Sequence, residues 1–218
     1  MGICMFMRKG SVHTEPIQPL PSGYTELEYI QSSGAQYIDT DFIPNQDTRV
    51  MMDIEISSIA KYGSYLFGIR KKMNSLGFSS VLLANQFWTE YKNEMNGSSV
   101  TIPVSRYTVD ANKNVFTLSA NGEAIKTVTR TYSAFTCEHS LMLLALISTD
   151  TTDDYTIYDG TQTSGKLYSC QIYDNDMLVR DFVPAMNGSG VVGLYDRVND
   201  VFYADAAGGA FTAGPEVA

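Results

Sequence analysis

The 218-residue sequence contains few cysteines and few basic residues, and it lacks a long apolar run. Its three cysteines are an odd number, and their spacing fits neither a zinc site nor a disulfide-rich secreted scaffold. We therefore expect Cys137 and Cys170 to be small core residues, with a disulfide between them as the alternative.

Basic residues are outnumbered by acidic ones, 15 to 24, which gives a formal net charge of −9. Binding to nucleic acid needs a clustered basic surface, so we expect no nucleic acid partner. The one dense basic run, Arg70 to Lys72, is typical of a solvated turn. No apolar stretch approaches the roughly 18 residues of a membrane span, so we expect no membrane insertion.

The N-terminal segment differs in composition from the rest. We interpret residues 1–15 as an N-terminal arm, residues 16–23 as a proline-rich linker, and residues 24–218 as one domain. An arm of this kind either docks on a larger assembly or is a frayed end. Both interpretations stay open.

Amphipathic helix patterns are missing, and the hydrophobic period from Tyr24 onward is two. In residues 48–57, Val50, Met52, Ile54 and Ile56 fall on one face, as in a half-buried strand, and the other face carries Arg49, Met51, Asp53 and Glu55. Asn121-Gly122 between two alternating runs predicts a β-hairpin. The apolar run 141–147 favours a central strand buried on both faces, with a buried helix as the alternative. Residues 165–184 predict two strands around positions 174–176.

Many short strands joined by polar turns predict an all-β fold, an antiparallel β-sandwich of the jelly-roll type. Residues 188–193, GSGVVG, match the glycine fingerprint of dinucleotide-binding sites. That fingerprint needs a helix after it, whereas GLYD and VFY around RVND predict a short hairpin. We therefore interpret these glycines as turn residues and expect no dinucleotide cofactor.

Residues 20–56 and 165–214 carry a recognisable pattern. The second segment contains RDFVPA, GVVGLYD, FY and FTAGP in that order. With the first segment, it resembles the concanavalin A-like, laminin-G-type jelly-roll domains of bacterial surface proteins and tailed-phage structural proteins. The resemblance frames the domain at both ends and is weaker in its middle. It implies a concanavalin A-like fold and display on a virion or bacterial cell surface.

The sequence offers little for catalysis. Jelly-roll glucanases have three acids at alternate positions of one strand. This sequence offers only pairs of acids at such a spacing, namely Asp53 with Glu55 and Glu26 with Glu28, and neither pair is followed by a third acid. A solvated strand face explains both pairs more simply. His13 and His139 lie far apart in the sequence, and we expect His139 at a strand end near the core. We expect no enzyme activity and no catalytic residue, and a jelly-roll glycosidase is the minor alternative.

Sugar binding needs flat aromatic rings flanked by hydrogen-bonding groups. The segment 85–96 is richest in both, and Tyr62 and Tyr65 could contribute from a nearby loop. The predicted ligand-binding residues are Trp88, Tyr91, Asn93, Tyr62 and Tyr65. The competing interpretation is that one of Phe87 and Trp88 is a core residue and that the tyrosines pack at strand edges.

Calcium is the metal that this composition suits best. The loop 148–160 gathers hard oxygen ligands in Asp150, Asp153, Asp154 and Asp159, although an acidic loop is usually only solvated. Laminin-G-like domains often hold calcium between loops, and the resemblance extends the expectation of a calcium site to this chain. We list calcium as the one cofactor that the chain could bind.

Taken together, these observations predict a non-catalytic binding or adhesion module for a glycan or cell-surface polysaccharide. The N-terminal arm could dock on capsid or tail proteins. The alternative is a purely structural virion decoration or appendage subunit. Localisation on a virion or a bacterial cell surface is the corresponding expectation.

Overall fold

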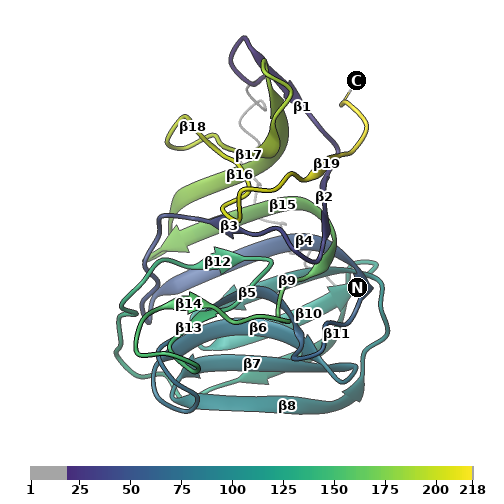
Figure 1. Ribbon diagram of the computed structural model, residues 1–218. Helices are drawn as coiled ribbons and strands as arrows, with labels where there is room; N and C mark the ends of the chain where they lie inside the picture. The colour runs from purple at the N-terminus through teal and green to yellow at the C-terminus, as the bar shows by residue number, and fades with distance from the viewer. Residues whose placement is uncertain (1–18, 218) are drawn as a thin grey trace, which may run out of the picture.

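The computed structural model describes residues 19–217, and within them the chain forms β-strands and turns without a helix. Two sheets pack face to face as a β-sandwich (Figure 1). The all-β jelly-roll prediction is therefore confirmed. Residues 1–18, with the predicted arm and most of the linker, lie outside the described part. None of the described residues belongs to a helix able to cross a membrane.

The first sheet has 11 strands, of which eight form a continuous path. In spatial order the path is β11 (Glu123–Thr129), β10 (Val115–Ala120), β9 (Arg106–Asn112), β4 (Thr48–Ser58), β15 (Ser164–Asp174), β16 (Met177–Asn187), β17 (Val192–Asp196) and β18 (Val201–Tyr203). Three short strands pair beside it: β1 (Tyr24–Glu26), β2 (Ile30–Ser33) and β19 (Thr212–Ala213).

Strand β4 shows why this sheet forms. Burial alternates along it, and Val50, Met52, Ile54 and Ile56 are all at most 2% exposed, as predicted. Between them, the charged side chains of Arg49, Asp53 and Glu55 face outward and form ion pairs with neighbouring strands. Arg49, for example, donates to both carboxylate oxygens of Asp110 on β9, at 2.8 and 2.7 Å. One face of the strand thus supplies the core, and the other is solvated.

The second sheet has eight strands. Its path is β14 (Thr156–Ile157), β13 (Ile147–Ser148), β5 (Ser64–Arg70), β6 (Gly77–Leu83), β7 (Gln86–Lys92) and β8 (Glu94–Thr101). Strands β12 (Met142–Leu143) and β3 (Ile38–Asp39) lie at its side.

The apolar run 141–147 is buried throughout, as expected, but the prediction of one continuous strand is wrong. It divides into β12, antiparallel to β5, and the start of β13, parallel to β5. Leu144 between them has a φ of 67° and turns the chain. The turn sends Leu143 into the main core and Leu146 to the opposite face of the sheet.

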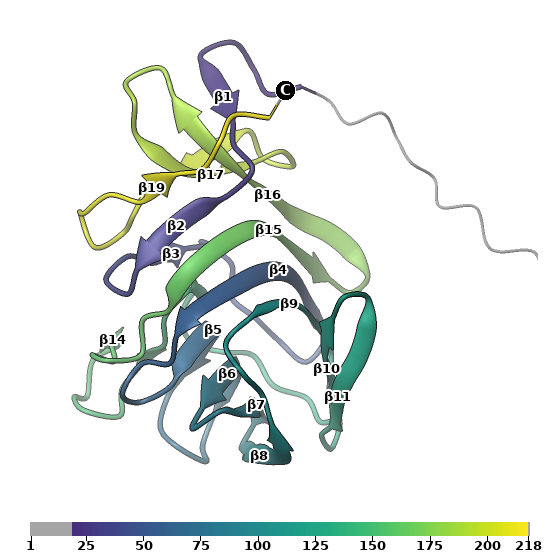
Figure 2. The same cartoon turned by 90° about the vertical axis from the view of Figure 1, so that its right-hand side faces the viewer.

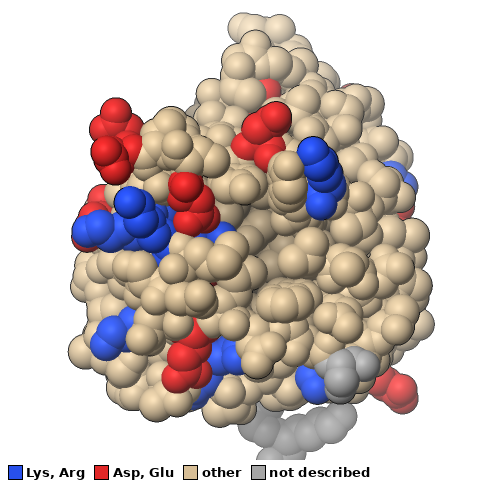
Figure 3. All heavy atoms as spheres, turned by 60° about the horizontal axis from the view of Figure 1, so that its bottom comes forward, with Lys and Arg blue, Asp and Glu red and all other residues tan. Residues whose placement is uncertain are grey.

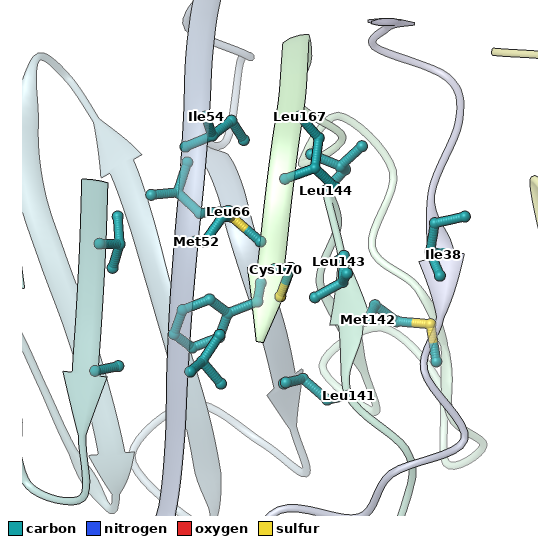
Figure 4. Packing of buried hydrophobic residues seen from close by; sticks show 14 of the residues in the cluster. Ile38, Met52, Ile54, Leu66, Leu141, Met142, Leu143, Leu144, Leu167 and Cys170 are labelled. Atoms are coloured by element: carbon teal, nitrogen blue, oxygen red, sulfur yellow. The ribbon is translucent and has the colours of Figure 1, made fainter. Parts of the chain in front are cut away.

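The core lies between the two sheets. Figure 4 shows Met52 and Ile54 of β4 and Leu167 and Cys170 of β15 near Leu66 of the second sheet. Cys170 is 0% exposed, and Cys137, which is 4% exposed, belongs to the same cluster. Both are free thiols, so the core-residue interpretation is confirmed over the disulfide.

The predicted turns form where the sequence places them. Asn121 and Gly122 have φ values of 51° and 80° and join β10 to β11. Asn175 and Asp176, at 49° and 64°, join β15 to β16. Both central residues of such a turn need positive φ, which asparagine and glycine adopt at little cost.

The GSGVVG segment is a turn followed by β17, and β17 pairs with β18 as the predicted hairpin. A Cβ at Gly193 would stand 2.9 Å from Phe202 Cζ and would overlap the Tyr203 carbonyl oxygen. Gly188 and Gly190 lie in the turn, as interpreted from the sequence, whereas Gly193 lies within β17, where its lack of a side chain lets β17 and β18 approach closely.

The two ends of the described chain lie side by side. β2 pairs with β19, and Leu27 forms a β-bridge with Glu216. Figure 2 shows β1 and the C-terminus at one end of the molecule and β8 at the other. Leu20, within the predicted linker, packs against a small apolar cluster of β16 and β17.

Candidate functional site

A cavity of about 410 Å³ opens on the outer face of the second sheet, the face turned away from the core. It lies over β5, beside β13 and the loop that precedes β15. Seen from below the view of Figure 1, this side of the molecule is mostly uncharged and is hollowed near its middle (Figure 3). The lining residues are Lys61, Tyr62, Tyr65, Arg70, Met73, Leu83, Met95, Leu146, Asp150, Tyr158 and Thr161.

Strand alternation decides which side chains reach this face. On β7, Phe87 and Tyr91 point into the core and are 0% exposed. Trp88 and Glu90, at the intervening positions, point to the outer face, where Trp88 packs against the cluster of Tyr65, Val81 and Leu146. Successive side chains of a strand point to opposite faces.

Three glycines on neighbouring strands make room for large side chains to lie flat on the sheet. A Cβ at Gly68 of β5 would stand 2.9 Å from Tyr65 Cδ1. A Cβ at Gly77 of β6 would stand 2.5 Å from Glu90 Cδ, and one at Gly97 of β8 would stand 2.5 Å from Trp88 Nε1. The glycines thus fix the positions of two aromatic rings and one carboxylate on this face.

A buried charge network lies beneath the cavity. Arg70 Nε donates to Glu90 Oε2 at 2.9 Å, and Arg70 Nη1 donates to Asp150 Oδ2 at 3.0 Å. Arg70 Nη2 donates to the Tyr65 hydroxyl at 2.7 Å. The side chains of Arg70, Glu90 and Asp150 are 3%, 0% and 13% exposed. We expected Arg70 in a solvated turn, and that prediction is wrong because two carboxylates compensate its burial.

Burial shifts the ionisation of this network. It raises the pKa of Glu90 to about 7, against the opposing effect of the Arg70 cation and of the hydrogen bond from Ser79. Burial lowers the pKa of Arg70, but Glu90, Tyr65 and Asp150 outweigh it and raise that pKa overall. Arg70 is therefore always charged, whereas Glu90 titrates near neutral pH.

Tyrosines form the wall of the cavity farthest from β7. The rings of Tyr62 and Tyr158 meet edge to face, with centroids 5.7 Å apart. Tyr62 is 46% exposed, and the ammonium group of Lys61 lies 4.7 Å from the centroid of its ring. This wall offers an exposed aromatic surface beside a hydrogen-bonding floor.

The structure brings together some of the predicted ligand-binding residues and separates others. Tyr62 and Tyr65 line the cavity, and Trp88 lies on the same face. Tyr91 points into the core, where its hydroxyl donates to the Gln46 carbonyl at 3.1 Å, so it cannot share a surface with Trp88. Asn93 is exposed at the turn between β7 and β8 and is not among the lining residues.

The four predicted calcium ligands do not converge. Asp150 accepts from Arg70 and from the Met73 amide, and Asp153 is fully exposed with Lys72 at 3.9 Å. Asp154 and Asp159 are exposed at other points of the loop. In residues 19–217, no group of three or more His, Cys, Asp or Glu side chains is placed to hold a metal ion.

The acid pairs considered for catalysis lie on the first sheet. Asp53 accepts two hydrogen bonds from Arg106, at 2.9 and 2.8 Å, and Glu55 Oε1 lies 3.2 Å from Lys166 Nζ. Glu26 Oε2 lies 2.7 Å from Arg197 Nη2. These three acids thus engage cations, as expected of a solvated strand face. Glu28, the fourth, is exposed.

His139 is half-buried in the segment before β12, and its Nδ1 lies 3.1 Å from Ser140 Oγ. His13 lies outside the described residues.

No protein-family model and no curated protein matches the chain. Several solved structures are similar in fold. The heptameric SAP-like pentraxin of Limulus polyphemus has 12% identity and a TM-score of 0.46, covering 88% of this chain and 94% of that one. The CBM40 of the Ruminococcus gnavus IT-sialidase, bound to α2,3 sialyllactose, has 17% identity and a TM-score of 0.46, covering 69% and 91%.

Domains LG4–5 of the mouse laminin α1 chain have 14% identity and a TM-score of 0.40, covering 75% of this chain and 46% of that one. At such identities the likeness concerns the fold.

Proposed function

We propose that this chain is a non-catalytic carbohydrate-binding module and that the cavity over β5 is its binding site. The observation that carries the proposal is a concave site whose aromatic wall stands beside polar groups fixed by a buried network. A volume of about 410 Å³ lies within the range of small-ligand pockets.

The site has the two kinds of surface that a sugar ring needs. Tyr62 and Tyr158 present aromatic carbon to the apolar face of a pyranose. Asp150 and Lys61 supply hydrogen-bonding groups for its hydroxyls. Because Asp150 is held by Arg70 and by the Met73 amide, little conformational entropy is lost when a ligand binds it.

Trp88 extends this surface beyond the cavity. It lies on β7, two strands from Tyr65 on β5, and neighbouring strands are spaced about 4.8 Å apart. A glycan of more than one residue could therefore reach from the tyrosine wall toward the indole ring.

We place the module on a virion or bacterial cell surface, in line with the resemblance of residues 20–56 and 165–214. The glycan would then belong to a cell-surface polysaccharide. Docking on capsid or tail proteins through residues 1–15 is part of the same proposal.

A glycan array followed by calorimetry tests the proposal. We expect binding to at least one glycan, weakened by about tenfold or more, or about 1.4 kcal/mol, in Tyr62→Ala and Tyr158→Ala. Tyr132→Ala is the matched control, since Tyr132 is 53% exposed and lies outside the lining residues. Binding to no glycan would overturn the proposal and favour a structural subunit. Equal weakening in all three variants would overturn the placement of the site.

A further inference from the structure

The arginine beneath the cavity is already occupied by this chain's own acids. All three of its guanidinium nitrogens donate to partners: Nε to Glu90, Nη1 to Asp150, and Nη2 to the Tyr65 hydroxyl. Its side chain is only 3% exposed. A ligand carboxylate normally pairs with an arginine through two parallel hydrogen bonds. Arg70 has neither the free edge nor the exposure for such a pair.

The local charge also disfavours an anion. When Glu90 is ionised, one guanidinium faces two carboxylates, which leaves the floor of the cavity with one net negative charge. The other cation of the lining is Lys61, which is exposed at the rim beside Tyr62. The nearest charge that a ligand meets on the floor is Asp150, since its side chain is 13% exposed and that of Glu90 is 0% exposed.

Asp150 is suited to hydroxyl donors. Its Oδ2 accepts from Arg70 at 3.0 Å and its Oδ1 accepts from the Met73 amide at 2.8 Å. Each carboxylate oxygen can accept a further hydrogen bond. A sugar hydroxyl can therefore donate to Asp150 without displacing either internal partner, whereas a ligand carboxylate brings a like charge and no donor.

Building on the proposed function, we infer that the cavity takes neutral sugars and discriminates against carboxylated sugars, such as sialic acids and uronic acids. Arg70 acts as a positioning residue that orients Asp150 toward the hydroxyls of the ligand. Specificity here comes from a repulsive acid as well as from attractive contacts.

The test uses pairs of glycans that differ in a carboxylate. Suitable pairs are N-acetyllactosamine and its sialylated form, oligogalactose and oligogalacturonate, and oligoglucose and oligoglucuronate. Calorimetry is carried out at pH 8, where Glu90 is ionised. We expect the neutral member of any pair that binds to bind at least about tenfold tighter. We also expect its affinity to change little between low and high NaCl, because no ligand charge is screened.

A pair of variants shows whether Asp150 sets the preference. Asp150→Asn removes the repulsive charge and frees one edge of Arg70, so the ratio of neutral to carboxylated affinity should fall by about tenfold. Asp153→Asn changes the net charge equally, but Asp153 is fully exposed and does not touch Arg70, so this ratio should stay unchanged. Retained affinity of Asp150→Asn for either glycan shows that the variant is folded.

The outcomes separate this inference from the proposed function. If no glycan binds, the proposed function fails. If the carboxylated member binds as tightly as the neutral one or tighter, or if both variants give the same ratio, the inference fails and the binding module stands.

Discussion

Replacing Arg70 with methionine should destabilise the fold strongly and in a pH-dependent way. The variant keeps most of the side-chain volume but leaves Glu90, which is 0% exposed, with the Ser79 hydroxyl at 3.3 Å as its remaining side-chain donor. Removing one partner of a buried ion pair costs about 3–5 kcal/mol. We expect a loss of that size in the free energy of unfolding at pH 8.

The pH dependence follows from the raised pKa of Glu90. Burial holds it at about 7 with Arg70 present, and removing the cation raises it further. A raised folded-state pKa gives stability that is complete below the unfolded value of about 4.3 and is lost as pH rises through the folded value. Above pH 7, Glu90 of the folded wild type is ionised beside Arg70. In the folded variant Glu90 stays protonated, because no cation compensates its buried charge. Because the wild type is itself only half ionised at pH 7, the gap between the two proteins should widen by about 1 kcal/mol from pH 7 to pH 8.

Urea unfolding followed by the fluorescence of Trp88 measures both quantities, since this single tryptophan lies on the same face as the network. Arg49→Met is the matched control. Arg49 also donates twice to a carboxylate, that of Asp110, but the two side chains are 30% and 34% exposed. Such a pair contributes about 1 kcal/mol or less, and we expect no change in its contribution between pH 5 and pH 8. The reasoning would be refuted if Arg70→Met lowered the free energy of unfolding no more than Arg49→Met does. It would also be refuted if the difference in that free energy between Arg70→Met and the wild type did not change with pH.

Two further predictions concern thiol reactivity and the glycine motif. In a Cys4→Ser variant, a thiol reagent should leave Cys137 and Cys170 unmodified in the native protein and modify both in denaturant, because burial raises the pKa of each thiol. Native-state reaction at either cysteine would contradict its place in the core. Gly193→Ala should lower the free energy of unfolding by about 1–3 kcal/mol because its Cβ would overlap β18. Gly188→Ala should be nearly neutral, since its nearest neighbour would be the Gly23 carbonyl oxygen at 3.4 Å, and chemical denaturation compares the two.

Features that depend on neighbouring residues were predictable from the sequence. The alternation of Val50, Met52, Ile54 and Ile56 gives the buried face of β4, and Asn121-Gly122 gives the β10–β11 turn. The structure of the run 141–147 was not predictable in this way, because a stretch that is apolar at every position shows neither the period of a strand nor that of a helix. Its division at Leu144 depends on contacts with β5, some 75 residues earlier in the chain.

The candidate site was predictable in part. Strict alternation along residues 86–92 would have paired Trp88 with Glu90 and assigned Tyr91 to the other face, so grouping Trp88 with Tyr91 overlooked a signal that was present. The burial of Arg70 carries no local signal. It depends on Glu90 and Asp150, which lie 20 and 80 residues away and reach the guanidinium only in the folded sheet.

The pairing of the last strand, β19, with β2 near the start of the described chain brings the two ends of that chain together. β2 pairs with β19, and the Val217 amide donates to the Glu26 carbonyl at 3.0 Å. A linker of a few residues could join these ends, and the chain could then be opened at the Asn121-Gly122 turn to give a circular permutant with the same strand neighbours. We therefore expect the cyclic order of the strands, and not which strand comes first, to specify the sandwich.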